Sequence, residues 1–260
     1  MSAQKLEKLP GTRPEGARDE REAAARVREM FGRIVPRYDF LNHLLSFSLD
    51  RVWRRRTARR FLHILRRPEA RVLDLCCGTG DLAFALDRVR ERTDTAAQRP
   101  PVIGADFVEA MLERAREKAR RSNHHAVFAA ADALHLPFPD ACFDLATLAF
   151  GFRNLASYEQ GLREIARVLK QGGEAGILEF TEPVRGPMAG LFRFYFKNIL
   201  PRIGGAISGD SEAYAYLPGS VAKFPSPLEL AALMRETGFA DVRIASWNFG
   251  SVVLHTARRV

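Results

Sequence analysis

Gly78, Thr79 and Gly80 form a tight turn that can bring a ligand close to the protein backbone. The turn follows a short β-branched and apolar run and precedes an apolar stretch with helical spacing. Glycine permits the close approach, and the amide groups that begin a helix favour a negatively charged ligand. Ala83 stands where a dinucleotide-binding turn would have its third glycine. The turn is therefore typical of nucleotide-binding α/β proteins, but its form disfavours NAD.

Two further strand-like runs end in carboxylates that can select a nucleoside. Asp106 ends the second run, and we expect it to accept hydrogen bonds from both ribose hydroxyls. Asp132 and Ala133 end the third run, where they can contact an adenine amino group. A Gly-Thr-Gly turn followed by these two acids resembles the nucleoside–methionine site of the Rossmann-like methyltransferase superfamily. The resemblance implies S-adenosylmethionine as the cofactor; the alternative is an NAD-binding or non-catalytic domain of the same fold.

The segment after the fourth strand-like run usually faces the second substrate in such enzymes, and here it contains Arg153 and Asn154. It lacks the Asn/Asp-Pro-Pro-aromatic tetrapeptide of enzymes that methylate base amino groups. Cys142 precedes the strand, so it is badly placed to be the nucleophile of a cytosine C5 enzyme. The paired glutamates of arginine methyltransferases are also missing. The sequence therefore disfavours these three acceptor classes.

Seven strand-like runs, with helical stretches between most of them, must position these residues. Strands that alternate with helices predict a parallel sheet covered on both faces, with ligands bound beyond the carboxyl ends of the strands. We therefore expect an α/β, Rossmann-like fold with a mostly parallel seven-stranded sheet, helices on both faces and an N-terminal helical cap. The superfamily resemblance further implies an antiparallel last strand. The seven runs are residues 71–77, 101–107, 126–132, 143–150, 174–180, 241–249 and 251–259.

The chain divides into a tail, a cap and a catalytic domain. Residues 1–21 mix proline and glycine with charges and show no apolar period, which predicts a disordered tail. Residues 22–67 predict the N-terminal helical cap, whose first helix carries an apolar stripe from Val27 to Ile34 and ends before Pro36. Residues 68–260 predict the methyltransferase domain, with an aromatic insertion at about 181–223.

An ordered set of motifs resembles the ubiquinone/menaquinone biosynthesis C-methyltransferases from about residue 24 to residue 256. The resemblance implies transfer of a methyl group from S-adenosylmethionine to a ring carbon of a prenylated hydroquinone. It leaves open naphthoquinol against benzoquinol, the tail length and the oligomeric state, and another lipophilic or phenolic acceptor is the alternative. The motifs include RYDFLN (37–42), SF (46–47), DLCCGTGDL (74–82), LPF (136–138), FGFRN (150–154), LEF (178–180), LPRIG (200–204) and FP (224–225).

Methylation of an aromatic carbon needs an electron-rich ring, which loss of a phenolic proton supplies. Arg153 stays protonated, so we expect it to stabilise the phenolate oxygen, with Asn154 fixing a ring hydroxyl or a water. Tyr38 and Asp39 are expected to close over the acceptor and relay its proton. The alternatives are an ion pair between Arg153 and a neighbouring acid, and a packing or capping role for Tyr38 and Asp39.

The net charge of +9 arises largely in the arginine-rich segment 50–67. It predicts a surface that attracts an anion, either nucleic acid or acidic lipid headgroups, although a solvated helix face is the plainer alternative. Phe192, Phe194, Tyr195 and Phe196 could line a tunnel for an isoprenoid tail, with Arg193 and Lys197 at lipid headgroups; a helix that covers the sheet edge is the alternative. We expect transient membrane contact and no nucleic-acid partner.

Several absences limit the expected location and chemistry. No run of about 18 apolar residues occurs, and the first residues lack the apolar core of a secretory signal. The three cysteines and six histidines show neither metal-ligand spacing nor a disulfide framework, so we expect no metal. The sequence therefore predicts a cytoplasmic enzyme that visits the inner face of the membrane.

Overall fold

A seven-stranded sheet forms the centre of the computed structural model, which describes residues 9, 11–14, 16–91, 99–182, 190, 194–199, 202 and 211–260. The order across the sheet is β3-β2-β1-β4-β5-β7-β6. The first five strands are parallel, and β7 runs antiparallel to both of its neighbours. The expected fold class and the antiparallel last strand are therefore confirmed. The strands are β1 (Val72–Leu75), β2 (Ile103–Asp106), β3 (Val127–Ala130), β4 (Phe143–Ala149), β5 (Leu169–Phe180), β6 (Phe239–Trp247) and β7 (Val252–Arg259).

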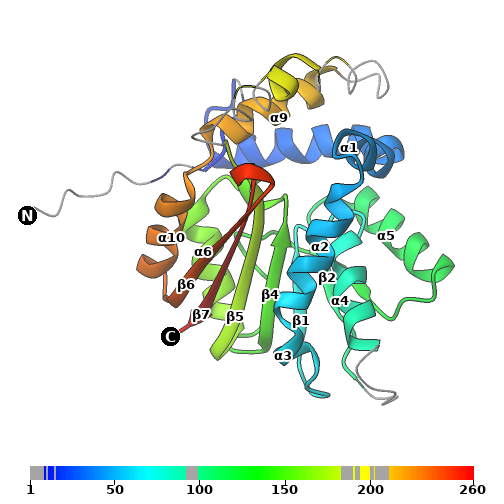
Figure 1. The fold of residues 1–260 in the computed structure, drawn as a ribbon, viewed down its shortest axis with the longest axis vertical. Coiled ribbons are helices and arrows are strands. Elements are labelled where there is room, and N and C mark those ends of the chain that lie inside the picture. The colour runs from blue at the N-terminus through cyan, green and yellow to red at the C-terminus, as the bar shows by residue number, and fades with distance from the viewer. Residues whose placement is uncertain are drawn as a thin grey trace, which may run out of the picture.

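Helices cover both faces of the sheet (Figure 1). One face packs against α2 (Leu49–Arg60), α3 (Leu62–Leu65), α4 (Asp81–Glu91) and α5 (Glu109–Arg121), and the other against α6 (Tyr158–Val168) and α10 (Pro227–Glu236). Buried Phe61, Leu65 and Leu86 belong to the first layer of the core. Buried Leu162, Ile165 and Met234 belong to the second. Burial on both faces explains why every residue of β1 is buried, instead of every second one.

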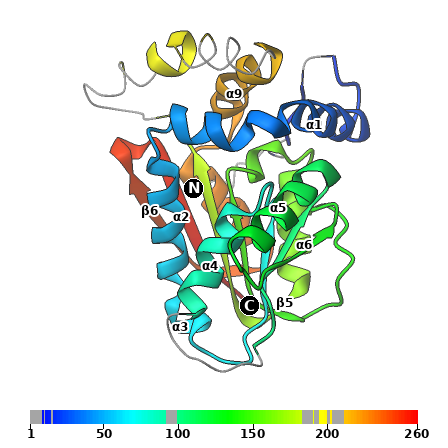
Figure 2. The same cartoon turned by 90° about the vertical axis from the view of Figure 1, so that its right-hand side faces the viewer.

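Helix α1 (Glu20–Leu45) lies across the end of the sheet toward which the parallel strands run, with α9 (Ser211–Lys223) beside it (Figure 2). The expectation that this helix ends before Pro36 is wrong, because α1 continues for nine residues beyond the proline. A proline inside a helix costs about 3 kcal/mol, whereas burying a leucine contributes about 1.5–3 kcal/mol. Leu41 and Leu45 are both buried in the same apolar cluster as Ile34. Their burial offsets the missing hydrogen bond.

The predicted tail begins to fold before residue 21. Asp19 caps α1 by accepting a hydrogen bond from the amide of Glu22. Thr12 is buried, and its amide donates to the carbonyl oxygen of Leu155 at 2.8 Å. This part of the chain therefore packs on the domain, which corrects the expected tail, while residues 1–8, 10 and 15 lie outside the described residues.

The aromatic insertion is described only in part. The π-helical turn η2 (Tyr195–Ile199) and α9 belong to it, whereas Phe192, Arg193 and most of the Leu-Pro-Arg-Ile-Gly motif lie outside the described residues. The side chains of Phe196 and Lys197 are also not described. Tyr195 donates a hydrogen bond to the carbonyl oxygen of Leu45 at 2.8 Å, so this part of the insertion lies on the end of α1. Among the described residues, no helix is both long enough and apolar enough to cross a membrane.

Candidate functional site

A cleft with about 780 Å³ of empty space lies beyond the carboxyl ends of β1, β2 and β4, where α1 covers it. Four of the predicted cofactor residues line it: Gly78, Asp106, Asp132 and Ala133. The sheet brings them together because the carboxyl ends of its parallel strands meet at one edge. Two of these residues are carboxylates at strand ends, the kind of group that accepts hydrogen bonds from a ribose in α/β proteins. The cleft can therefore hold a nucleoside beside the glycine turn.

Asp106 is fixed in the cleft wall by two backbone amides. Its Oδ2 accepts a hydrogen bond from the amide of Gly78 at 2.8 Å, and its Oδ1 accepts one from the amide of Val108 at 2.9 Å. Burial raises the pKa of this carboxyl above its ordinary value, although the two amides act in the opposite direction. The carboxylate thus ties the glycine turn to the second strand and keeps its remaining lone pairs at the cleft.

The rest of the glycine turn also has structural roles within the protein. Gly80 has a φ of +87°, and a Cβ atom there would lie 2.9 Å from the ring of Phe128. Glycine is therefore required at this position for backbone conformation and close packing. Thr79 is buried, and its hydroxyl donates to the carboxylate of Asp39 on α1. The turn therefore also links the cofactor cleft to the helix above it.

A smaller recess of about 310 Å³ extends from the cleft beneath Tyr38, and Thr79 lines it. Asp74 lies at its base and is completely buried. Its Oδ1 accepts a hydrogen bond from Thr147 at 2.9 Å, but its Oδ2 has no hydrogen-bond partner. Burial raises the pKa of Asp74 to about 7. A buried carboxyl oxygen without a partner favours a cationic ligand group at this end of the cleft.

A second pocket of about 640 Å³ lies between α1, α9 and the short helix η1 (Phe152–Asn154). Phe31, Tyr38 and Phe150 line both this pocket and the cleft, so the two spaces adjoin at these three rings. Phe150 stacks on Phe180 with ring centroids 4.4 Å apart. A flat aromatic acceptor can lie against such a wall, next to a cofactor in the cleft.

Arg153 lines the second pocket, but it is also held in a buried ion pair. Its Nη1 lies 2.7 Å from Oε1 of Glu179 and donates to the carbonyl oxygen of Phe150 at 2.5 Å. The opposite oxygen of Glu179 accepts a hydrogen bond from the backbone amide of Arg153 at 3.1 Å. The structure therefore contains the ion pair that the sequence left as the alternative for Arg153.

Glu179 was not among the residues predicted for the site, although it is completely buried beside Arg153. Its signal in the sequence is an acid in the fifth strand-like run, one residue before the run ends. Such an acid is rare in a buried strand unless it has a partner. Sequence alone could not pair it with Arg153, because the two lie on separate elements 26 residues apart.

Asn154 lies on the cofactor side of the boundary between the two spaces. Its Oδ1 accepts a hydrogen bond from the hydroxyl of Tyr216 on α9 at 3.1 Å. The same hydroxyl lies 3.1 Å from Oγ1 of Thr12. Asn154 therefore holds α9 and the N-terminal segment over the site, and its amide nitrogen has no hydrogen bond to either residue.

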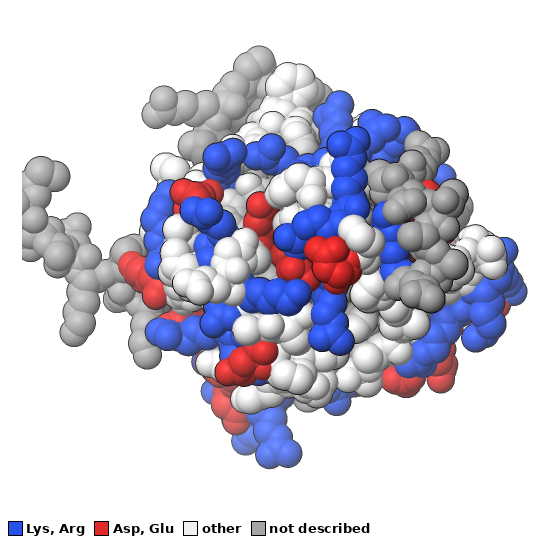
Figure 3. Space-filling view, turned by 90° about the horizontal axis from the view of Figure 1, so that it is seen from below, with Lys and Arg blue, Asp and Glu red and all other residues white. Residues whose placement is uncertain are grey.

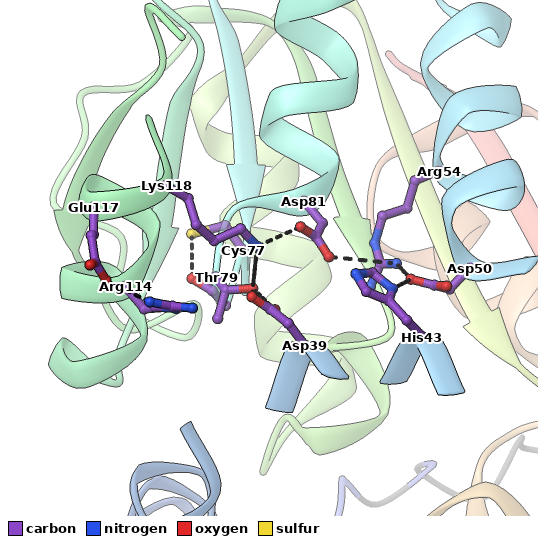
Figure 4. Close-up of polar contacts among 11 residues, drawn as sticks. Asp39, His43, Asp50, Arg54, Cys77, Thr79, Asp81, Arg114, Glu117 and Lys118 are labelled. Atoms are coloured by element: carbon purple, nitrogen blue, oxygen red, sulfur yellow. Dashed lines mark hydrogen bonds and ion pairs between the residues drawn. The ribbon is translucent and has the colours of Figure 1, made fainter. Parts of the chain in front are cut away.

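The structure separates Asp39 from the other three predicted catalytic residues. Asp39 lines neither the cleft nor the second pocket. It points toward Thr79 and Lys118, with its Oδ2 2.9 Å from the ammonium nitrogen (Figure 4). Lys118 also lies 2.6 Å from Asp81, the first residue of α4. Asp39 thus joins α1 to the cofactor turn, and this position does not favour the predicted proton relay.

Comparison with known proteins gives a consistent result over nearly the whole chain. A sequence model of the ubiE/COQ5 methyltransferase family matches residues 18–259. The protein named demethylmenaquinone methyltransferase in Deinococcus radiodurans is 47% identical over 232 residues, which cover 89% of this chain and 92% of that protein. Its namesake in Thermus thermophilus is 48% identical over 230 residues, 88% of this chain and 100% of that protein.

A solved structure resembles the fold. The crystal structure of a SAM-dependent methyltransferase from Thermotoga maritima superposes with a TM-score of 0.57 at 18% identity. The superposition covers 89% of this chain and 99% of that one. At this identity the likeness supports the fold alone.

Proposed function

Because the chain belongs to the ubiE/COQ5 methyltransferase family, we propose that it transfers a methyl group from S-adenosylmethionine to a ring carbon of demethylmenaquinol. The observation that carries the proposal is the family match over residues 18–259, together with two relatives of that name at 47% and 48% identity. A benzoquinol of the ubiquinone pathway is the second candidate acceptor, since other relatives at 42% identity bear a name with both pathways. Both are prenylated hydroquinones, so the chemistry is the same.

The residues of the cleft fit S-adenosylmethionine, which supplies an electrophilic methyl group on a cationic sulfur. Asp106 would hold the ribose, and Asp132 with Ala133 would hold the adenine. Gly78 gives room for the cofactor along the turn. Asp74 lines the recess, where its carboxyl group would be near the cationic, amino-acid end of the cofactor. The carboxylates therefore match both ends of this ligand.

The adjoining pocket suits the acceptor. Its aromatic wall of Phe150 and Phe180 would hold the hydroquinone ring, and apolar Met30, Ile34 and Leu217 would contact the isoprenoid tail. Since the two spaces adjoin at Tyr38, a ring in the pocket can meet a methyl group in the cleft, and the surrounding side chains exclude water.

The protonated guanidinium of Arg153 would stabilise the phenolate oxygen of the acceptor. Glu179 balances its charge and fixes its position, so that the arginine is oriented before the acceptor binds. Tyr38 lies where the ring and the methyl group meet, and its hydroxyl is our candidate to receive a hydrogen bond from the acceptor. Asn154 would fix a ring hydroxyl or a water from the cofactor side.

The acceptor is a membrane lipid, so the proposed enzyme works at the cytoplasmic face of the membrane and contacts it only transiently. The test is analysis of quinones extracted from a strain of the host that lacks the gene. We expect the demethylated quinone to accumulate, and a plasmid with the wild-type gene to restore the methylated form. Unchanged quinones in the deletion strain would contradict the proposal.

A further inference from the structure

Large hydrophobic side chains are exposed at one end of the molecule. Seven of the eleven exposed large hydrophobic residues in the described part of the chain lie on the end of α1, the start of α2, the turn between these helices, the residue before η2, and the β6–β7 turn. Phe47 and Phe249 are each 76% exposed, which is unusual because phenylalanine side chains are mostly buried in folded proteins. We call this set the apolar crown. Its members are Phe40, Leu44, Phe47, Leu49, Val52, Phe194 and Phe249.

Contacts between the supporting elements bring the apolar crown together. The ring of Phe47 lies 6.0 Å from that of Tyr195, the residue after Phe194. Trp53 donates a hydrogen bond to Asn248 at 2.8 Å, which holds the β6–β7 turn against α2. Figures 1 and 2 both show the end of α1, the start of α2 and this turn at the same end of the molecule.

A groove with five unpaired arginines begins beside the apolar crown. It runs between α2, α4 and α5 and contains about 2050 Å³ of empty space. These arginines are exposed, and the described residues provide no ion-pair partner for them. Three of them stand four residues apart on α2, a spacing at which like charges destabilise a helix by about 0.2–0.5 kcal/mol per pair. The five are Arg51, Arg55, Arg59, Arg66 and Arg88.

The other cations of the groove already have partners. Lys118 is paired with Asp39 and Asp81, Arg54 with Asp50, and Arg114 with Glu117. The opposite end of the molecule, seen from below, shows Lys and Arg beside Asp and Glu (Figure 3). The five groove arginines have no such acidic partner among the described residues, and their positive charge attracts an anionic partner.

We propose that the apolar crown and the arginine groove together dock the enzyme on a bilayer that contains acidic phospholipids. The crown enters the interfacial layer, and the groove arginines pair with lipid phosphates. The inference rests on the proposed function, because it needs a substrate that resides in the membrane. Asn42, Ser46 and Asp50 line the acceptor pocket and lie on the same two helices as the crown. Docking would thus bring that pocket to the bilayer surface.

The experiment measures co-sedimentation of the full chain with vesicles of phosphatidylglycerol and phosphatidylcholine, and with vesicles of phosphatidylcholine alone. We expect binding to the acidic vesicles that weakens as salt rises, since screening acts over about 8–10 Å at physiological ionic strength. The double variant Phe47→Ser/Phe249→Ser should bind at least about tenfold more weakly, the scale of one exposed aromatic ring lost from a lipid interface. Leu228→Ser is the matched control, because Leu228 is 75% exposed on distant α10.

A pair of charge-matched variants tests the groove. Arg51→Gln/Arg55→Gln should lower binding to acidic vesicles about thirtyfold, since each of the two basic residues near such a surface contributes about 1 kcal/mol. Arg56→Gln/Arg60→Gln removes the same charge from α2, outside the groove, and should lower binding much less. Adding inorganic diphosphate at constant ionic strength tests whether the groove binds a free phosphate compound instead of a lipid headgroup. If diphosphate binds in the groove but leaves the binding of the protein to acidic vesicles unchanged, the assignment of the groove to lipid headgroups is wrong.

Equal losses in the two arginine pairs, or equal losses in Leu228→Ser and the phenylalanine variant, would overturn the proposal. Methylation of a short-tailed, water-soluble acceptor is measured on every variant and should stay at the wild-type rate. If the wild type lacks that activity, the proposed function fails, and the vesicle results still decide the docking surface on their own. Loss of vesicle binding with normal methylation of the soluble acceptor supports docking.

Discussion

Four acids around the cofactor turn have different partners, and the partners decide what each can bind. Glu179 is neutralised by Arg153, and Asp39 by Lys118. Asp106 accepts two backbone hydrogen bonds, and Asp74 has one oxygen without a partner. The first two therefore hold the protein together, whereas Asp106 and Asp74 have capacity left for a ligand.

Replacing Asp106 tests the ribose contact. Asp106→Ala is expected to weaken S-adenosylmethionine binding by roughly 1.5–3 kcal/mol, the scale of a hydrogen bond to a charged group. Asp106→Asn is the comparison: it keeps the size of the side chain, but its single amide oxygen can accept only one of the bonds from Gly78 and Val108, so it separates loss of charge from loss of volume. Calorimetry measures both affinities. An unchanged affinity in a folded Asp106→Ala protein would remove Asp106 from the cofactor site.

The raised pKa of Asp74 predicts that both the stability of the protein and its affinity for the cofactor depend on pH. Its folded pKa of about 7 exceeds the unfolded value of about 3.9, so the folded state binds more protons between these values. Without cofactor, stability should therefore fall as pH rises from about 4 to about 7, and Asp74→Asn should remove this part of the slope. Cofactor affinity should rise over the same interval, because a cation favours the carboxylate. Denaturation and calorimetry at several pH values check both; the same slopes in Asp74→Asn would refute the assignment.

Replacing Arg153 tests whether this residue of the acceptor pocket takes part in methyl transfer. Arg153→Lys keeps the charge beside Glu179 but loses the planar fork that also reaches Phe150 and Ser220. We expect single-turnover methylation at saturating cofactor to slow about 10²–10³-fold, as for loss of one oxyanion donor, while cofactor affinity holds. Glu179→Gln is the comparison, since leaving Arg153 unpaired should mainly cost stability, about 3–5 kcal/mol. Wild-type turnover in Arg153→Lys would make the arginine structural.

At the scale of elements, α1 covers the site and connects its parts. Its residues Phe31 and Tyr38 line the two spaces, and Asp39, the residue after Tyr38, contacts the cofactor turn. The sequence predicted a helical cap but ended its first helix at Pro36, because local rules place a helix end before a proline. The burial of Leu41 and Leu45 depends on α9 and η2, which are far away in the sequence. The local sequence pattern around Pro36 could not reveal the stabilisation that this burial provides.

Asp39 should affect cofactor retention more than methyl transfer. Asp39→Asn weakens the ion pair with Lys118 and should raise the dissociation constant of the cofactor several-fold, the scale of roughly 1 kcal/mol for one such interaction. The single-turnover rate at saturating cofactor should stay within about twofold. Tyr38→Phe provides the contrast, since Tyr38 lines both spaces and its loss should slow methylation. A large fall in the rate of Asp39→Asn at saturating cofactor would restore the predicted relay.

For the whole molecule, the number and type of the strands and helices follow from patterns that act over short distances, and the site follows from them only in part. Alternating strands and helices predicted the seven-stranded sheet, and the ends of its strands placed Gly78, Asp106 and Asp132 at one cleft. Side-chain partners across elements, such as Glu179 for Arg153, depend on how the sheet and α1 pack together. Spacing along the chain does not encode such partners.

The account as a whole depends on where the methyl group goes. The most direct measurement gives the purified full chain S-adenosylmethionine with an isotopically labelled methyl group and a short-tailed demethylmenaquinol under reducing conditions. Mass analysis and NMR of the product then locate the label. The account predicts one labelled methyl group on a ring carbon, with no label on the ring oxygens. Label on an oxygen, or no transfer by protein that binds the cofactor with normal affinity, would contradict it.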